Sequence, residues 1–297
     1  MPTLAPAPAE AQRIPLLRRA MAYIQVLKPR ETLLLSLMGW MTALVATGLH
    51  PSLGRFLLAG TAVLLGSAGA NGLTNCLDRG VDARMRRTRG RVLPAGLLGP
   101  AQAWVWCAGL TATALGMAWA LHPWAFGAGA LALACSLVAR KTWATHFLGA
   151  VSSCGPVWVA WFAFRPEVTP LFGLLSLLVA LWVPLHVWTL MLAYREDYLR
   201  AGVNIFPLDK GQRVAPWLCF ALAVGLLVVV GALAWIGGFG PLFGASAGAV
   251  GLLLCLACWR MARSPTPALA IRSFRLTAYP FLGVVFLAMP LDRWIGG

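Results

Sequence analysis

Long apolar runs recur along the chain, and short polar segments separate them. Nine windows approach the roughly 20 apolar residues that a helix needs to cross about 30 Å of hydrocarbon. These windows fall near residues 33–50, 56–76, 101–121, 123–139, 144–164, 168–193, 214–237, 241–259 and 274–292. The pattern predicts an all-α, polytopic membrane protein whose nine transmembrane helices form one bundle.

The segment before the first window differs from the rest. Residues 1–22 carry prolines and arginines but no long apolar run before a small-residue cleavage site, so we interpret them as a cytoplasmic tail and not as a signal peptide. Residues 23–297 then form one intramembrane domain. Composition agrees, because 60% of the residues are hydrophobic, 11% are charged and the mean hydropathy is +0.76. A soluble globule with a polar surface is excluded.

Basic residues indicate which side of the membrane each loop faces. With the N-terminus in the cytoplasm, 21 of the 24 Lys and Arg residues fall in the N-terminal segment or in loops on that same side. Only Arg55, Arg165 and Arg293 fall on the other side, which is the asymmetry of the positive-inside rule. The orientation of the protein in the membrane thus accounts for most of the net charge of +15. We expect no nucleic-acid partner, because the basic residues are spread over five short loops next to the membrane.

Acidic residues are scarce and concentrated. Five of the nine lie at the inner ends of spans two and six or in the loops that follow, namely Asp78, Asp82, Glu196, Asp197 and Asp209. Two acidic groups at one membrane face predict two walls of one pocket. No Ser, His and acid spacing that suggests a catalytic triad occurs in the sequence, and no glycine-rich phosphate loop.

The first acidic group is part of a polar stripe. If the helix of span two continues through it, Asn71, Asn75, Asp78 and Asp82 recur at i, i+4, i+7 and i+11 on one face. A carboxylate near the hydrocarbon boundary costs up to about 2.5–3.5 kcal/mol on insertion scales, and two facing each other repel. A cation between them offsets both costs. Mg²⁺ is the candidate, because one or two carboxylates and the oxygens of a substrate phosphate are its usual ligands.

Five arginines follow the stripe within eight residues: Arg84, Arg86, Arg87, Arg89 and Arg91. Their planar, permanently charged groups suit a diphosphate. The positive-inside rule alone explains any one of these arginines, but it does not explain the aspartates.

Three segments resemble one known family. The stretch "NCLDRGVDARM" followed by "RRTRGRVLP" resembles the first motif of the UbiA superfamily of intramembrane prenyltransferases, and more closely that of its haem-farnesylating branch. "YIQVLKPRE" and "HVWTLMLAYREDYLRAGVNIFPL" are similar to further segments of that branch, in the same order. The likeness reaches from about residue 23 to residue 211, and nine spans is also the count of the family.

The resemblance implies a metal and diphosphate site. It makes Asp78 and Asp82 ligands of Mg²⁺ with help from Asn75, and it adds Asp197, in the second acidic motif, to the ligands of the metal. The implied diphosphate partners are all basic: Lys28, Arg30, Arg87, Arg91, Lys141 and Arg195.

Two positions depart from the family pattern. Thr74 stands where the family has an asparagine four residues before the first aspartate, and Gly80 replaces an acid between the two ligands. Whether Thr74 or Asn75 reaches the metal is therefore left open.

The branch also implies an acceptor. Mg²⁺-assisted ionisation of farnesyl diphosphate would pass the farnesyl group to a vinyl group of haem b, and water would complete haem o. His186 is our first choice for holding the haem and His146 the second, with Trp188 and Tyr194 beside them. The resemblance and the loop charges together imply a cell (inner or plasma) membrane protein whose active site opens to the cytoplasm.

Two other interpretations stay open. A UbiA-type transferase could instead act on a quinone-precursor aromatic acid, a chlorin or a lipid alcohol, although the His-x-Trp and Tyr-Arg-x-Asp-Tyr segment favours haem. From another class, the chain could be a transporter or a non-catalytic haem carrier. Transporters usually show repeated halves and helices broken at mid-membrane, whereas the acids here gather at one face.

Overall fold

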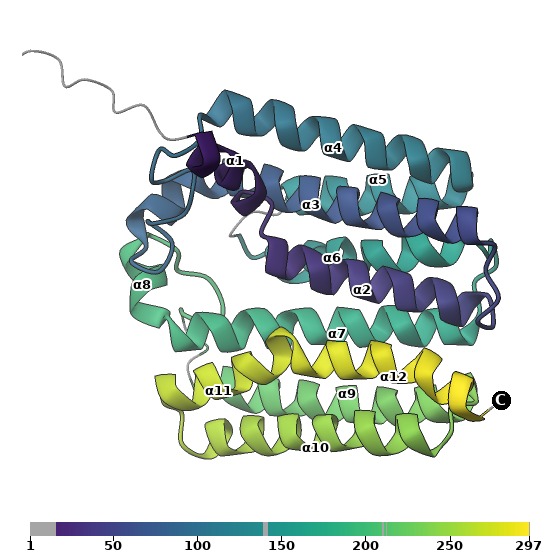
Figure 1. The fold of residues 1–297 in the computed structure, drawn as a ribbon. Helices are drawn as coiled ribbons and strands as arrows, with labels where there is room; N and C mark the ends of the chain where they lie inside the picture. The colour runs from purple at the N-terminus through teal and green to yellow at the C-terminus, as the bar shows by residue number, and fades with distance from the viewer. Residues whose placement is uncertain (1–15, 139–141, 210, 212, 297) are drawn as a thin grey trace, which may run out of the picture.

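The computed structural model describes residues 16–138, 142–209, 211 and 213–296 (Figure 1). All the regular secondary structure in these ranges is helical. In chain order the helices are α1 (Leu16–Gln25), α2 (Pro29–Ala46), α3 (Leu53–Arg84), α4 (Pro100–Leu121), α5 (Pro123–Val138), α6 (Thr145–Phe162), α7 (Pro170–Ala193), α8 (Arg195–Arg200), α9 (Ala215–Gly237), α10 (Pro241–Arg263), α11 (Pro267–Ala278) and α12 (Pro280–Gly296).

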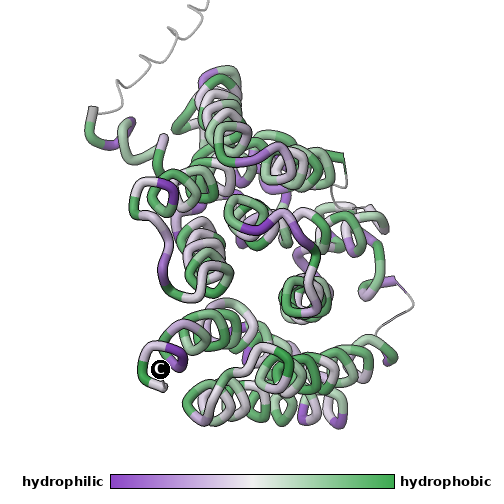
Figure 2. The backbone as a smooth tube through the Cα atoms, turned by 90° about the vertical axis from the view of Figure 1, so that its right-hand side faces the viewer, coloured by the Kyte–Doolittle hydropathy of each residue, from purple (hydrophilic) through white to green (hydrophobic). Residues whose placement is uncertain are grey.

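Helix α7 lies at the middle of the bundle. Figure 1 shows α2 to α6 on one side of α7 and α9 to α12 on the other. We call the end where α3, α7 and α10 finish the basic end, on the left of Figure 1, because the predicted cytoplasmic loops gather there. Viewed at right angles in Figure 2, the helices carry hydrophobic residues along most of their length.

Each predicted window contains a helix. Six stretches of the described chain are long and apolar enough to cross a membrane: α3, α4, α7, α9, α10 and the stretch Pro267–Gly296 that comprises α11 and α12. Helix α5 is apolar but has only 16 residues. The protein is therefore an all-helical, multipass membrane protein, and the count of nine spans stays a prediction.

The last predicted window is not one straight helix. Tyr279 separates α11 from α12, and Pro280 begins the second of them. Proline has no N–H to donate to the carbonyl four residues earlier, so the hydrogen-bond ladder is interrupted at this point.

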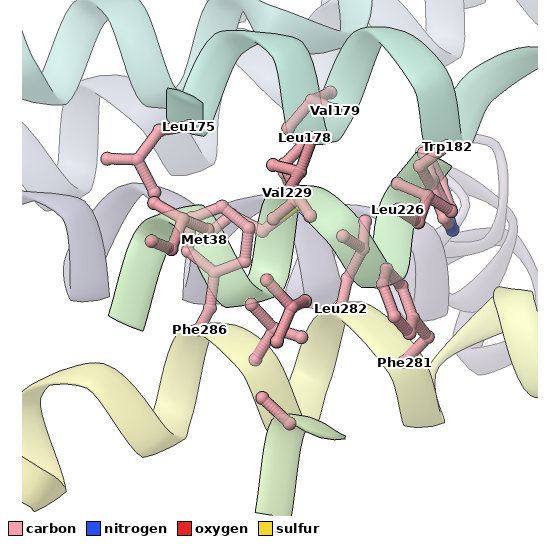
Figure 3. Close-up of a cluster of buried hydrophobic side chains, with 14 of the residues drawn as sticks. Met38, Leu175, Leu178, Val179, Trp182, Leu226, Val229, Phe281, Leu282 and Phe286 are labelled. Atoms are coloured by element: carbon pink, nitrogen blue, oxygen red, sulfur yellow. The ribbon is translucent and has the colours of Figure 1, made fainter. Parts of the chain in front are cut away.

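Large apolar side chains fix the two halves of the bundle together. Met38 of α2, Leu178 of α7, Leu226 of α9 and Phe286 of α12 are all 0% exposed and belong to one core (Figure 3). Within a bilayer the lipid is as apolar as these side chains, so close packing and not exclusion from water holds such helices together. The core gives α7 a fixed position against which a site can be built.

Helices α3 and α4 approach closely through glycines. A Cβ atom placed on Gly69 would lie 2.2 Å from Thr111 Oγ1, and one on Gly72 would lie 2.1 Å from Cys107 Sγ. No larger side chain fits there, which is typical of small residues at membrane helix interfaces. These contacts hold α3, the helix that carries the polar stripe.

Two of the three basic residues that break the positive-inside pattern donate hydrogen bonds to carbonyls at helix ends. Arg55 donates from Nη2 to the carbonyls of Leu121 at 2.8 Å and Ala163 at 2.7 Å, where α4 and α6 end. Arg293 similarly donates to carbonyls at the ends of α2 and α9, at 3.1 and 2.9 Å. The last carbonyls of a helix have no partner within it and carry partial negative charge. Each guanidinium therefore donates hydrogen bonds to carbonyls at the ends of two helices.

Candidate functional site

The polar stripe lies on one continuous helix. Helix α3 continues without a break to Arg84, so Asn75, Asp78 and Asp82 lie on one face of the same helix. All three side chains are buried, at 8, 7 and 3% exposed. Met85 then leaves the helix with extended backbone angles, and the chain turns back.

The returning chain brings an arginine to the second aspartate. Nη1 of Arg91 donates to Oδ2 of Asp82 at 2.9 Å, and the hydroxyl of Thr88 donates to the Asp82 carbonyl at 3.0 Å. A hydrogen bond between ionised groups is shorter and about twice as strong as a neutral one. This pair places a predicted diphosphate partner directly beside a predicted metal ligand.

The link between α1 and α2 closes the other side. Asn75 Nδ2 donates to the Val26 carbonyl at 2.7 Å, and Asn71 Nδ2 donates to the Thr32 hydroxyl at 3.0 Å. Lys28, between these two contacts, has φ +51°, a conformation that costs a non-glycine residue about 1–3 kcal/mol. The two asparagines of α3 thus hold the strained link in place.

A small cavity of about 160 Å³ results, which we call the inner polar pocket. Its polar lining is made by Gln25, Lys28, Asn75, Asp82 and Arg91. Asn75 Oδ1 is buried and accepts no hydrogen bond from any described residue. The Thr74 hydroxyl, by contrast, donates to the Asn71 carbonyl at 2.8 Å. Of the two side chains left open by the sequence, Asn75 is therefore the one with a spare acceptor oxygen.

These groups fit Mg²⁺ by their chemistry. The described residues contain no group of three His, Cys, Asp or Glu side chains able to hold a metal, so thiolate or imidazole sites of the zinc type are not present there. Two carboxylates on one helical face and an unsatisfied amide oxygen remain. Such a small set of oxygen donors matches the few protein ligands that Mg²⁺ takes when a substrate phosphate supplies others.

A larger cavity of about 300 Å³, which we call the central cavity, lies between α2, α3, α4, α5, α6 and α7. Lys28 lines both it and the inner polar pocket, with Asn71 and Thr74 near that end. Most of its remaining wall is apolar or small. Small residues recur along two helices that face it: Ala62, Gly66, Ala70, Ala114 and Ala118. This spacing of four residues is a sequence signal that hydropathy windows do not detect.

The second acidic group contacts the first through the backbone. Asp197 on α8 accepts hydrogen bonds from the N–H groups of Arg86 at 2.6 Å and Arg87 at 3.0 Å, and Arg200 lies 3.5 Å away. Burial opposes ionisation of Asp197, but the two N–H groups and the guanidinium groups of Arg200 and Arg87 outweigh it and lower its pKa. Both carboxylate oxygens therefore hold the segment after α3.

The structure places Asp197 and Asp82 in separate cavities. Asp197 lines a third cavity of about 830 Å³, which we call the arginine cavity, and this cavity shares no lining residue with the inner polar pocket. The predicted single pocket with two acidic walls is thus not what the structure shows. The reason is the orientation of the Asp197 carboxylate, which caps backbone N–H groups at the end of α3.

The predicted diphosphate partners are distributed in the same way. Lys28 and Arg91 lie at the inner polar pocket, whereas Arg87 and Arg195 line the arginine cavity. The guanidinium of Arg87 also lies 5.2 Å from the ring centre of Tyr194. Arg30 is exposed at the start of α2. Lys141 lies outside the described residues.

The two predicted haem-binding histidines occupy different places. The His186 ring stacks on Trp182 at 4.7 Å, and its Nδ1 lies 3.0 Å from the Thr277 hydroxyl of α11. It therefore faces away from the central cavity, which Val183 and Val187 of α7 line. Hydropathy could not reveal this, because it does not fix the rotation of a helix about its axis.

His146 lies closer to the central cavity. Nε1 of Trp188 donates to His146 Nδ1 at 3.1 Å, and the Phe206 ring packs against both. The neighbours of this pair in sequence, Thr145 and Val187, line the central cavity.

A mostly apolar cavity within a membrane bundle shares Lys28 with a pocket that is lined by a carboxylate, an amide and cations, an arrangement suited to an apolar chain with a charged phosphate head. The chain belongs to the UbiA prenyltransferase family, whose profile matches residues 32–287. It is a prenyltransferase.

Curated relatives agree with this assignment. The chain is 34% identical to a protoheme IX farnesyltransferase of Desulforudis audaxviator, over 93% of this chain and 89% of that protein. It is 32% identical to the enzyme of the same name from Symbiobacterium thermophilum, over 91% and 93%.

The fold resembles two solved structures at low sequence identity. One is of digeranylgeranylglyceryl phosphate synthase, with a TM-score of 0.75, 15% identity and coverage of 93% of this chain and 98% of that chain. The other is a UbiA homolog from Archaeoglobus fulgidus bound to GPP and Mg²⁺, with a TM-score of 0.64, 16% identity and coverage of 90% and 99%.

Proposed function

We propose that this prenyltransferase moves a farnesyl group from farnesyl diphosphate to a vinyl group of haem b and so forms haem o. The observation that carries the proposal is the junction at Lys28 between the central cavity and the inner polar pocket. The names of the relatives, protoheme IX farnesyltransferase, support the choice of donor and acceptor.

The central cavity is long enough for the farnesyl tail. Thr74 and Ala62 both line it, and about 18 Å of helix α3 separates them at 1.5 Å per residue. An extended chain advances about 3.3–3.6 Å for every three bonds, so the main chain of a farnesyl group spans about 13 Å. The tail then lies among Val63, Ala118 and Val159, and the diphosphate lies at the basic end.

Asp78, Asp82 and the amide oxygen of Asn75 would hold Mg²⁺, which when bound neutralises the diphosphate and makes it a better leaving group. The side chains of Lys28 and Arg91 add positive charge that stabilises the departing diphosphate. The apolar wall keeps water from the allylic cation that forms when the C–O bond breaks. Water exclusion and charge placement are therefore the two tasks of these residues.

For Asp197 we propose a positioning role. The resemblance assigns it to the metal, but in the structure both of its oxygens accept from the backbone of Arg86 and Arg87. That contact fixes the segment which carries Arg91 back to Asp82. Arg30, Arg87, Arg195 and Lys141 stay predicted partners of the diphosphate.

The acceptor is proposed to lie near His146 or His186, with Trp188 and Tyr194 as neighbours. The hydrogen-bonded His146 and Trp188 beside the central cavity support the first of these places. In the reaction a C–C bond forms between the farnesyl C1 and the outer vinyl carbon as the C–O bond to diphosphate breaks. Water then adds to the resulting cation and loses a proton, which gives the hydroxyethylfarnesyl side chain.

The charge pattern supports the orientation. We propose nine spans in the cell membrane, with the N-terminus and the basic end in the cytoplasm, because 21 of 24 basic residues then face inward. The diphosphate site at the basic end would open to that side.

Purified protein supplied with Mg²⁺, farnesyl diphosphate and haem b tests the proposal. We expect haem o and diphosphate in equal amounts, identified by mass spectrometry. Unmodified haem b together with a prenylated aromatic acid, chlorin or lipid alcohol would move the assignment to another acceptor.

A further inference from the structure

The proposed reaction uses the lining of the arginine cavity only in part, because Arg86, Arg200 and Arg213 have no task in it. Five arginines line it, namely Arg86, Arg87, Arg195, Arg200 and Arg213, against two carboxylates. One of those carboxylates, Asp197, is already held by two backbone N–H groups. Arg213 is exposed and forms no ion pair with a described residue. The lining therefore presents a surplus of positive charge to any anion that enters.

The cavity lies at the depth of the lipid headgroups. It is built where α7 and α10 end and where α9 and α11 begin, so all four helices contribute their termini at the basic end. Helices of 23 or 24 residues span about 35 Å, slightly more than the hydrocarbon core of about 30 Å. Their ends consequently reach the layer of lipid phosphates.

Part of the wall is apolar. Leu192, Pro216 and Met261 line the cavity together with the arginines, and Met261 is only 1% exposed. A small inorganic anion needs no such wall, whereas an amphipathic anion contacts both kinds of surface. The cavity also shares no lining residue with the inner polar pocket or the central cavity.

We propose that the arginine cavity binds the phosphate headgroup of an anionic phospholipid from the adjacent leaflet. Basic pockets between membrane helices on the cytoplasmic side are suited to such headgroups. The headgroup phosphate lies between Arg200 and Arg213, and the glycerol and the first acyl carbons lie against Met261 and Leu192. Through Asp197, the bound lipid contacts the segment that leads to the inner polar pocket.

Native mass spectrometry of the full-length protein in detergent tests this, with phosphatidylglycerol and phosphatidylcholine as the added lipids. Wild type is expected to bind phosphatidylglycerol saturably and more tightly than phosphatidylcholine. Each basic residue near the surface contributes about fivefold to such affinity, so the pair Arg200→Gln and Arg213→Gln should weaken it about thirtyfold. The matched pair Arg260→Gln and Arg272→Gln removes the same charge at exposed positions that do not line the cavity and should leave it unchanged.

Several results would overturn the proposal. An equal loss of phosphatidylglycerol affinity in the two double variants would show general attraction to a basic surface. Equal binding of phosphatidylglycerol and phosphatidylcholine by wild type would show no headgroup selection. Displacement of the lipid by inorganic diphosphate would assign the cavity to a soluble phosphate compound, and displacement by haem b would assign it to the acceptor. If the double variant does not fold, Arg213→Gln alone should weaken binding about fivefold, and no change there contradicts the proposal.

Discussion

At the scale of single residues, the site depends on a few oxygen atoms held in place by neighbours. Asn75 shows how one side chain can do two things, since its Nδ2 secures the link before α2 while its Oδ1 stays unsatisfied. A buried polar atom without a partner costs about 1–3 kcal/mol, which a bound cation would recover.

We predict that Asn75→Ala lowers the rate of diphosphate release about 10–100-fold and raises the Mg²⁺ concentration needed for half-maximal rate. Thr74→Val, of nearly the same shape, should leave that Mg²⁺ concentration unchanged, because the Thr74 hydroxyl is bonded within its own helix. An Mg²⁺ titration of both variants is the measurement. The opposite ranking would place the metal at Thr74.

Asp197→Asn separates positioning from metal binding. The variant keeps one acceptor oxygen but loses the charge, so we expect the rate to fall about tenfold while the half-maximal Mg²⁺ concentration stays the same. A rise in that concentration would instead make Asp197 a ligand.

The same residue predicts a pH response. Because the folded pKa of Asp197 is lowered, its contact with Arg86 and Arg87 contributes stability above the ordinary carboxyl pKa of about 3.9 and loses it as the pH falls below that value. Amide exchange at Arg86 and Arg87 should therefore be constant from pH 8 to pH 5 once corrected for the intrinsic rate. Loss of protection near pH 6 would contradict the assignment.

At the scale of elements, the position of α3 decides the site. Its glycines let α4 approach within contact of the backbone, and its extension to Arg84 carries the aspartates beyond the apolar part of the span. The extension follows from the sequence, which has no proline between Leu53 and Arg84.

We predict that Gly72→Val, which drives a branched side chain into Cys107, lowers the thermal unfolding temperature and also weakens farnesyl diphosphate binding. Gly80→Ala is the control, because nothing lies within 4 Å of a Cβ there. Equal behaviour of the two variants would show that α3 does not need its close approach to α4.

Sequence patterns predicted the elements better than their orientation. Every apolar window contains a helix, and the stripe at Asn75, Asp78 and Asp82 lies on one face, because both follow from helical periodicity. Helical periodicity did not predict that the His186 side chain points toward α11, or that the Asp197 carboxylate points toward the backbone of Arg86 and Arg87. Both depend on contacts between segments about 90 to 110 residues apart, which a local pattern does not contain.

At the scale of the whole molecule, the bundle joins two environments that the reaction needs. The central cavity has a mostly apolar or small lining along about 18 Å of α3, and the inner polar pocket at the basic end is lined by a carboxylate from α3 and by cations from the link before α2 and the segment after α3. The core between α2, α7, α9 and α12 holds these parts in register (Figure 3). In the proposed function, an apolar chain and its charged leaving group bind in two adjacent cavities that share Lys28 as a lining residue.

The most direct test of that claim is to locate the tail of the donor. A farnesyl diphosphate analogue with a photoreactive diazirine on its last isoprene unit can be bound with Mg²⁺, irradiated and mapped by mass spectrometry. Labelling is predicted at Val63, Ala118 or Val159, in the central cavity, and unmodified farnesyl diphosphate should prevent it. Labels on α9 or α10, or in the arginine cavity, would contradict the account.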